Sequence, residues 1–150
     1  MLLSKTADLN IVEEKEATRR NTLVKILHDS GYQHVSAASD VQSAIGLLGT
    51  DQFDLIIVEL YMPHINGLEF AKSVRTAKTL AKPSTRMIVM SALIQAKVVG
   101  TAMTLNVNGF ITKPFIPDLI DKKVQHVLNE VVKTHAAIAY ETIYTEIQNS

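Results

Sequence analysis

Short apolar runs alternate with amphipathic stretches along this chain, and this alternation limits the folds that it can adopt. Residues 53–58 (Phe-Asp-Leu-Ile-Ile-Val) are nearly all apolar, which predicts a central strand buried on both faces. Apolar side chains recur at i, i+3, i+4 and i+7 in Val41, Ala44, Ile45 and Leu48, which predicts one buried helical face. Strands that alternate with helices indicate an α/β fold, a parallel sheet covered on both faces.

The alternation repeats five times, so we expect a doubly wound (βα)5 domain with a five-stranded parallel sheet. Capping boxes at Ser39 with Gln42 and at Asn66 with Glu69 mark two helix starts. Pro117 suits the first turn of the last helix. The predicted strands cover residues 9–12, 35–38, 53–58, 87–90 and 109–112, and the helices begin near Thr18, Ser39, Asn66, Gln95 and Pro117, with ends expected at Ser30, Leu105 and Val132 for the first, fourth and last.

Composition narrows the function classes. The chain has 150 residues, the size of one compact domain, and 15 basic residues balance 15 acidic ones. A nucleic-acid binder usually has a basic excess, so we expect no direct contact with nucleic acid. The sequence contains no cysteine and no run of about 20 apolar residues, and its start lacks the pattern of a secretory signal. We therefore expect a cytoplasmic protein without a membrane partner.

Polar side chains gather where the predicted strands end. Glu13 and Glu14 follow the first strand, Glu59 the third, Ser91 the fourth and Lys113 the fifth. Each alone is ordinary, because a charged residue after a strand is usually solvated and a serine there often caps a helix. Together they predict a site, since ligands of open α/β sheets bind at the carboxyl ends of the strands.

Four segments in the same order and spacing resemble bacterial response-regulator receiver domains. The resemblance runs from about Leu9 to Glu130 and rests on residues 11–20, 54–69, 87–92 and 109–115. It implies a flavodoxin-like fold, a receiver domain at residues 1–132 and a C-terminal helical extension at residues 133–150.

The resemblance also implies roles for the residues at the strand ends. The acidic pair Glu13-Glu14 stands where the family holds a divalent cation, usually Mg²⁺, and Glu59 stands at the phosphoacceptor aspartate. Ser91 and Lys113 match residues that contact the phosphoryl oxygens, and Lys113-Pro114 matches a peptide bond that is commonly cis. Phe110 matches an aromatic residue that changes rotamer as the domain switches, although a plain core residue is the simpler interpretation.

Glutamate at all three acidic positions departs from the family pattern. One extra methylene displaces a carboxylate by over an ångström, a misplacement that can cost about 100-fold in rate. Mg²⁺ needs near-octahedral geometry, which longer ligands disturb, although Mg²⁺ or Ca²⁺ at Glu13, Glu14 and Glu59 stays open. We predict a non-enzymatic pseudo-receiver that requires no cofactor. Glu59 is then either a phosphomimetic that reaches Lys113 or only a structural partner of that lysine.

Two further positions near the predicted pocket have simple explanations. His64 lies in the loop after Glu59, where a histidine is usually exposed, and we do not expect it to be a ligand. Asn66 stands where the family often has an acidic residue, and its capping role explains it.

The C-terminal extension carries an apolar stripe, Ala136, Tyr140, Ile143 and Ile147, at helical spacing. The stripe predicts an amphipathic helix, or a continuation of the preceding one, that folds back on the domain or pairs with a second copy. The sharper alternative is a signalling helix that leads to an effector domain.

We expect a protein partner: a histidine kinase, a phosphotransfer protein or a downstream effector. The resemblance places its surface on the fourth helix, fifth strand and fifth helix, which could also form a homodimer. The alternatives are a phosphorylatable, metal-dependent receiver and a flavodoxin-like cofactor binder. The cofactor binder would need a phosphate-binding loop after the first strand, but the loop there is Glu13-Glu14-Lys15-Glu16, whose negative charge would repel a phosphate.

Overall fold

The computed structural model describes residues 9–13, 17–62 and 64–147, with side chains from residue 20 onward. Its five strands form one parallel sheet in the order β2-β1-β3-β4-β5. The strands are β1 (Leu9–Glu13), β2 (His34–Ala38), β3 (Leu55–Glu59), β4 (Arg86–Ser91) and β5 (Gly109–Thr112). The helices are α1 (Ala17–Asp29), α2 (Val41–Leu48), α3 (Gly67–Arg75), α4 (Ala96–Thr104), α5 (Pro117–Leu128) and α6 (Ala137–Glu141).

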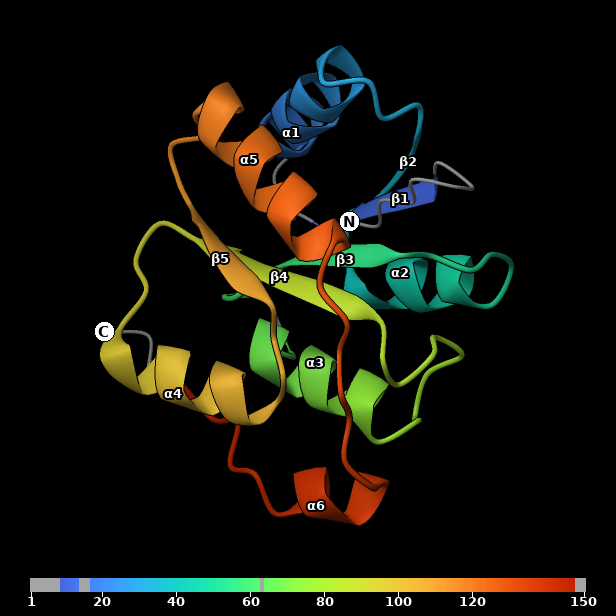
Figure 1. Cartoon of the computed structure of the whole chain (residues 1–150), viewed down its shortest axis with the longest axis vertical. Coiled ribbons are helices and arrows are strands. Elements are labelled where there is room, and N and C mark those ends of the chain that lie inside the picture. Colours follow the sequence, from blue (N-terminus) through green and yellow to red (C-terminus); the bar gives the residue numbers. More distant parts are fainter. Residues whose placement is uncertain (1–8, 14–16, 63, 148–150) are drawn as a thin grey trace.

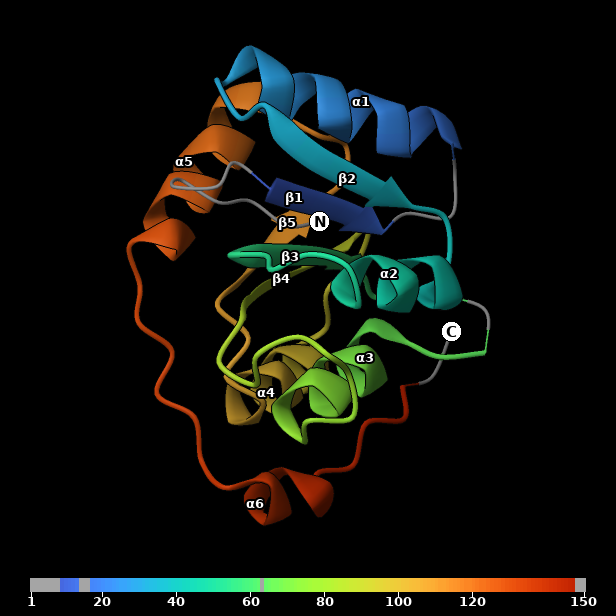
Figure 2. The same cartoon turned by 90° about the vertical axis from the view of Figure 1, so that its right-hand side faces the viewer.

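Helices cover both faces of the sheet, as the sequence predicts. Helices α1 and α5 lie on one face, and α2, α3 and α4 lie on the other (Figures 1 and 2). All five residues of β3 are buried, with Leu55 and Ile57 in the core beneath α1 and α5 and Ile56 and Val58 in the opposite core. Two separate apolar cores explain why this strand is apolar without alternation.

Of the two predicted helix caps, Asn66 is confirmed and Ser39 is not. Asn66 caps α3, because its side-chain oxygen accepts from the Glu69 N–H at 2.8 Å while its amide donates to the Glu69 carboxylate. The prediction of Ser39 as the cap of α2 is wrong. Asp40 caps this helix by accepting the Ser43 N–H at 2.7 Å from an extended backbone. A charged acceptor one residue closer to the first turn makes the stronger hydrogen bond.

Helix α5 ends at Leu128, so the prediction that it continues to about Val132 is wrong. The N–H groups of Asn129 and Glu130 bond to carbonyls three residues back, which tightens and ends the last turn. Arg86 then donates to the Glu130 carbonyl at 2.8 Å. This contact holds the departing chain at the start of β4 and directs it away from the helix axis.

The extension is helical over α6 alone, a shorter helix than the apolar stripe predicts. Tyr140 and the partly buried Ile143 and Ile147 pack against the core beneath α2–α4, whereas Ala136 is exposed. The stripe therefore folds back on its own domain, one of the outcomes expected of it. In both views α6 lies outside the layer formed by α3 and α4 (Figures 1 and 2). None of the helices in the described ranges combines the length and apolar character needed to cross a bilayer.

Candidate functional site

A buried ion pair occupies the carboxyl edge of the sheet. Glu59 ends β3, and Lys113 directly follows β5, with β4 between them. The Lys113 ammonium nitrogen lies 2.5 Å from Oε2 of Glu59, and the two side chains are only 9% and 6% exposed. Sequence analysis predicts this meeting, because both residues leave their strands at the same edge.

Backbone contacts fix both members of the pair. The Lys113 N–H donates to the Ser91 carbonyl at 3.0 Å, and the Lys113-Pro114 peptide bond is cis, as the resemblance implies. On the other side, the Tyr61 N–H donates to Oε1 of Glu59 at 3.5 Å. The turn behind Glu59 requires Gly67, since a Cβ there would lie 2.7 Å from the Glu59 carbonyl oxygen.

Ser91 lies at the same edge, at the end of β4. Its side chain is buried, and its hydroxyl oxygen accepts from the Leu93 N–H at 3.4 Å. The register pairs Glu59 with Met90 and Ser91 with Thr112, so the serine stands one residue beyond Glu59 on the neighbouring strand. The Glu59 carboxylate, the Ser91 hydroxyl and the Lys113 ammonium group therefore lie at the ends of the adjacent strands β3, β4 and β5, and each side chain is at most 9% exposed.

The acidic pair after β1 lies largely outside the described residues. The backbone of Glu13 pairs with Val58 of β3, whereas its side chain and the whole of Glu14 are outside the description. Among the side chains that are described, no three His, Cys, Asp or Glu residues are grouped to hold a metal ion. Among the described side chains the Glu59 carboxylate faces the Lys113 ammonium group, so a cation at Glu13, Glu14 and Glu59 stays a prediction and we derive no metal-dependent step.

Comparison with known proteins identifies the family. The family model described as the response regulator receiver domain matches residues 9–125. The chain belongs to this family. It is a receiver domain of two-component signalling, and it shares the flavodoxin-like α/β fold of its structural neighbours.

The relatives of this receiver domain, and the solved structures similar to it, include chemotaxis regulators. It is 24% identical to the chemotaxis protein CheY of Pseudomonas aeruginosa over 81% of this chain and 96% of the relative. It is 32% identical to the chemotaxis protein CheY homolog of Campylobacter jejuni over 80% of this chain and 91% of the relative. The structure of the Vibrio cholerae chemotaxis protein CheY4 matches with a TM-score of 0.71 and 25% identity, covering 79% of this chain and 98% of that one.

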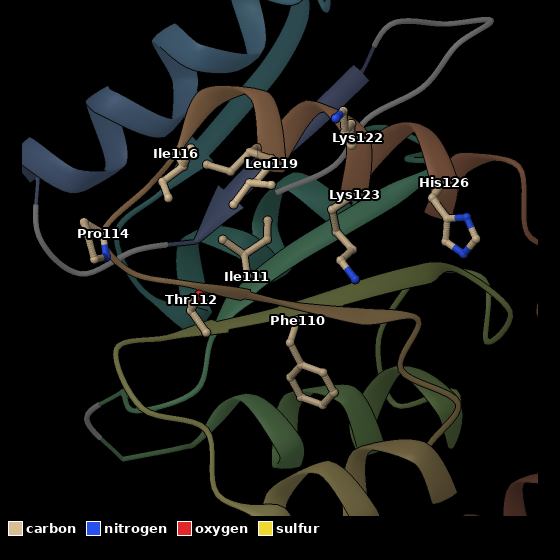
Figure 3. Close-up of a pocket in the computed structure, with 10 residues that line it drawn as sticks. Phe110, Ile111, Thr112, Pro114, Ile116, Leu119, Lys122, Lys123 and His126 are labelled. Carbon is tan, nitrogen blue, oxygen red and sulfur yellow. The ribbon is translucent and has the colours of Figure 1, made fainter.

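Phe110 and His64 differ in their burial in the receiver domain. Phe110 is half-buried and packs against the core beneath α2–α4, and Figure 3 shows its ring pointing away from α5. This placement agrees with a core residue and leaves its predicted role in switching as a prediction. His64 is exposed, with a left-handed backbone at φ 71°, and it stays outside the ion pair.

Sequence analysis missed a second feature beside the site, a groove of 410 Å³ between β5 and α5. Lys122, Lys123 and His126 of α5 line one side of it, and Ile116 and Leu119 are exposed near its end (Figure 3). The helical spacing of the three basic residues was the available signal, but such residues usually belong to a solvated helix face.

Proposed function

We propose that this receiver domain is a cytoplasmic, non-enzymatic pseudo-receiver that signals through protein contacts without accepting a phosphoryl group. Glu59 then takes the position at which the family carries its acceptor aspartate. The observation that carries the proposal is the buried pair of Glu59 and Lys113 at 2.5 Å.

The charges in this pair argue against phosphoryl transfer. A carboxylate attacks phosphorus only when cations neutralise the charge on the phosphoryl oxygens. The Lys113 ammonium group already neutralises the Glu59 carboxylate, and a phosphoryl group would need the same ammonium. The longer side chain also moves the nucleophile, and a misplacement of about 1 Å can lower a rate by about 100-fold.

The same pair favours one lasting conformation. Separating a buried carboxylate from its ammonium partner leaves an uncompensated charge, so the pair opposes rearrangement at the edge of the sheet. The Glu59 carboxylate lies near the place of a phosphoryl group and carries about half of its charge at neutral pH. We propose that it acts as a phosphomimetic that keeps the domain in its signalling state.

A small phosphodonor tests the proposal. The full chain is incubated with acetyl phosphate and Mg²⁺, and its intact mass is measured beside that of Glu59→Asp. We expect no mass gain in the wild type, whereas the aspartate variant, with the family's shorter acid, has a suitable nucleophile. Addition of one phosphoryl group to wild-type Glu59 would overturn the proposal and favour a phosphorylatable, metal-dependent receiver.

Glu59→Gln tests the phosphomimetic part, since it removes the negative charge at nearly constant size. We expect weaker partner binding by this variant, measured by titration against the partner. Equal binding by both proteins would leave Glu59 as a structural partner of Lys113.

We further propose that the partner, a histidine kinase, phosphotransfer protein or effector, binds on α4, β5 and α5. The groove between β5 and α5 supports this choice, because exposed Leu119 offers an apolar contact beside Lys123. Leu119→Asp should abolish binding, whereas Ile45→Asp, an exposed apolar position on α2, should leave it unchanged. Sedimentation of the same variants tests whether this surface instead pairs two copies of the chain.

A further inference from the structure

The chain after α5 runs along the outer side of α3 and is held to the domain by three side-chain hydrogen bonds. The Tyr140 hydroxyl donates to the Asn106 side chain at 2.6 Å, in the turn between α4 and β5. The Lys72 ammonium donates to the Ile143 carbonyl at 2.9 Å, and the Asn66 amide donates to the Thr145 carbonyl at 2.7 Å. The segment 131–147 therefore connects the α4–β5 turn with the beginning of α3.

Tyr140 is the most deeply buried side chain of this segment. Tyr140 is 0% exposed, whereas Ile138 on the same short helix is 74% exposed. The Tyr140 hydroxyl also accepts from the His135 N–H at 2.9 Å, and the two rings are 5.9 Å apart. Because residues 133–139 are exposed, the segment is attached by this tyrosine, by the partly buried Ile143 and Ile147 and by the two hydrogen bonds to its later carbonyls.

The segment contacts two residues, Asn106 and Asn66, that each organise a turn. Asn106 has a left-handed backbone with φ 57°, and its carbonyl accepts from the buried Arg75 at 2.9 Å. Asn66 caps α3, and the next residue, Gly67, packs directly on the Glu59 carbonyl. The segment thus reaches both the turn before β5 and the turn behind the Glu59–Lys113 pair.

We propose that residues 131–147 form a latch, a segment that closes over α3 and opens as one unit while the rest of the domain stays folded. Segments with few buried side chains and side-chain-mediated attachment open at lower free energy than the core. When closed, the latch restrains the α4–β5 turn and the start of α3 together. This inference goes beyond the proposed function and holds whether or not Glu59 accepts a phosphoryl group.

Hydrogen exchange of the full chain tests the latch. In Tyr140→Ala we expect amides of residues 64–70 and 103–108 to exchange roughly tenfold faster, as local opening becomes easier, with α1 and α5 unchanged. Ile138→Ala is the matched control, because it truncates an exposed side chain of the same helix and should leave exchange as in the wild type.

A second variant tests whether the latch moves as a unit. Lys72→Met keeps the aliphatic stem and removes only the hydrogen bond to the Ile143 carbonyl, so it should fold even if Tyr140→Ala does not. A cooperative latch predicts faster exchange, on the order of two- to fivefold, at residues 103–108 as well as beside Lys72. Faster exchange beside Lys72 alone, unchanged exchange in both regions, or uniformly faster exchange throughout Tyr140→Ala would overturn the proposal.

Discussion

Two buried cations lie near opposite edges of the sheet, and their partners differ. Lys113, at the carboxyl edge, pairs with a side chain, the Glu59 carboxylate. Arg75, at the end of α3, donates only to backbone carbonyls. These acceptors belong to residues before β4 and before β5, at the amino edge: Pro83, Thr85, Leu105 and Asn106.

The difference in partners indicates that Arg75 has a structural role, whereas Lys113 belongs to the candidate functional site. The guanidinium of Arg75 connects the end of α3 with the carbonyls that precede β4 and β5. Its several N–H donors in one planar group allow this, and a shorter or uncharged side chain lacks them. Burial lowers the pKa of Arg75 from its ordinary value to about 10, which still leaves it charged at neutral pH. Lys113 contacts a side-chain carboxylate, so a substitution at residue 59 changes the charge beside the ammonium group directly.

The largest expected effect is at Arg75. Arg75→Met fills similar space but leaves buried carbonyls without donors, each costing about 1–3 kcal/mol, so we expect the free energy of unfolding to fall by about 4 kcal/mol. Urea denaturation measures this loss. Arg86→Met, which removes a half-buried arginine that donates to the Glu130 carbonyl and, at 3.4 Å, to the Asp54 carbonyl, is the control and should cost about 1 kcal/mol. Similar losses in both variants would contradict the special role of Arg75.

Lys113→Met should rank second. It leaves the Glu59 carboxylate buried without its cation, and we expect a loss of about 3 kcal/mol in the free energy of unfolding. The double variant Glu59→Leu with Lys113→Met removes both charges and should recover most of that loss. If the double variant is no more stable than Lys113→Met, charge compensation does not explain the pair.

The two cations also show what the sequence could predict. Glu59 and Lys113 follow apolar strands, and parallel strands bring their ends to one edge, so the pair could be expected from spacing alone. Arg75 was not predicted, because it ends an amphipathic helix like any exposed arginine and its acceptors are backbone groups, which leave no trace in the sequence. The same reason explains the early end of α5, where a carbonyl bound by Arg86 directs the chain.

Tyr140→Phe should have a smaller effect than either cation variant. It keeps the buried ring and removes the hydroxyl that donates to Asn106 and accepts from His135, and we expect a loss of about 1 kcal/mol. Thermal unfolding beside Tyr144→Phe, a change at an exposed tyrosine, measures the difference. A loss as large as that of Arg75→Met would mean that Tyr140 and Arg75 form one network at the amino edge.

The smallest expected effect is at an exposed charged hydrogen bond, the cap of α2. The Ser43 N–H bond lowers the pKa of the Asp40 carboxyl below its ordinary 3.8, so protons bind Asp40 more tightly in the unfolded chain. The stabilisation is complete above about pH 4, and it is lost as the pH falls through the lowered pKa. Asp40→Asn caps without a charge, so its melting temperature should approach that of the wild type as the pH falls. Parallel profiles of the two proteins would show that the charge of this carboxylate, unlike that of Glu59, contributes nothing to the fold.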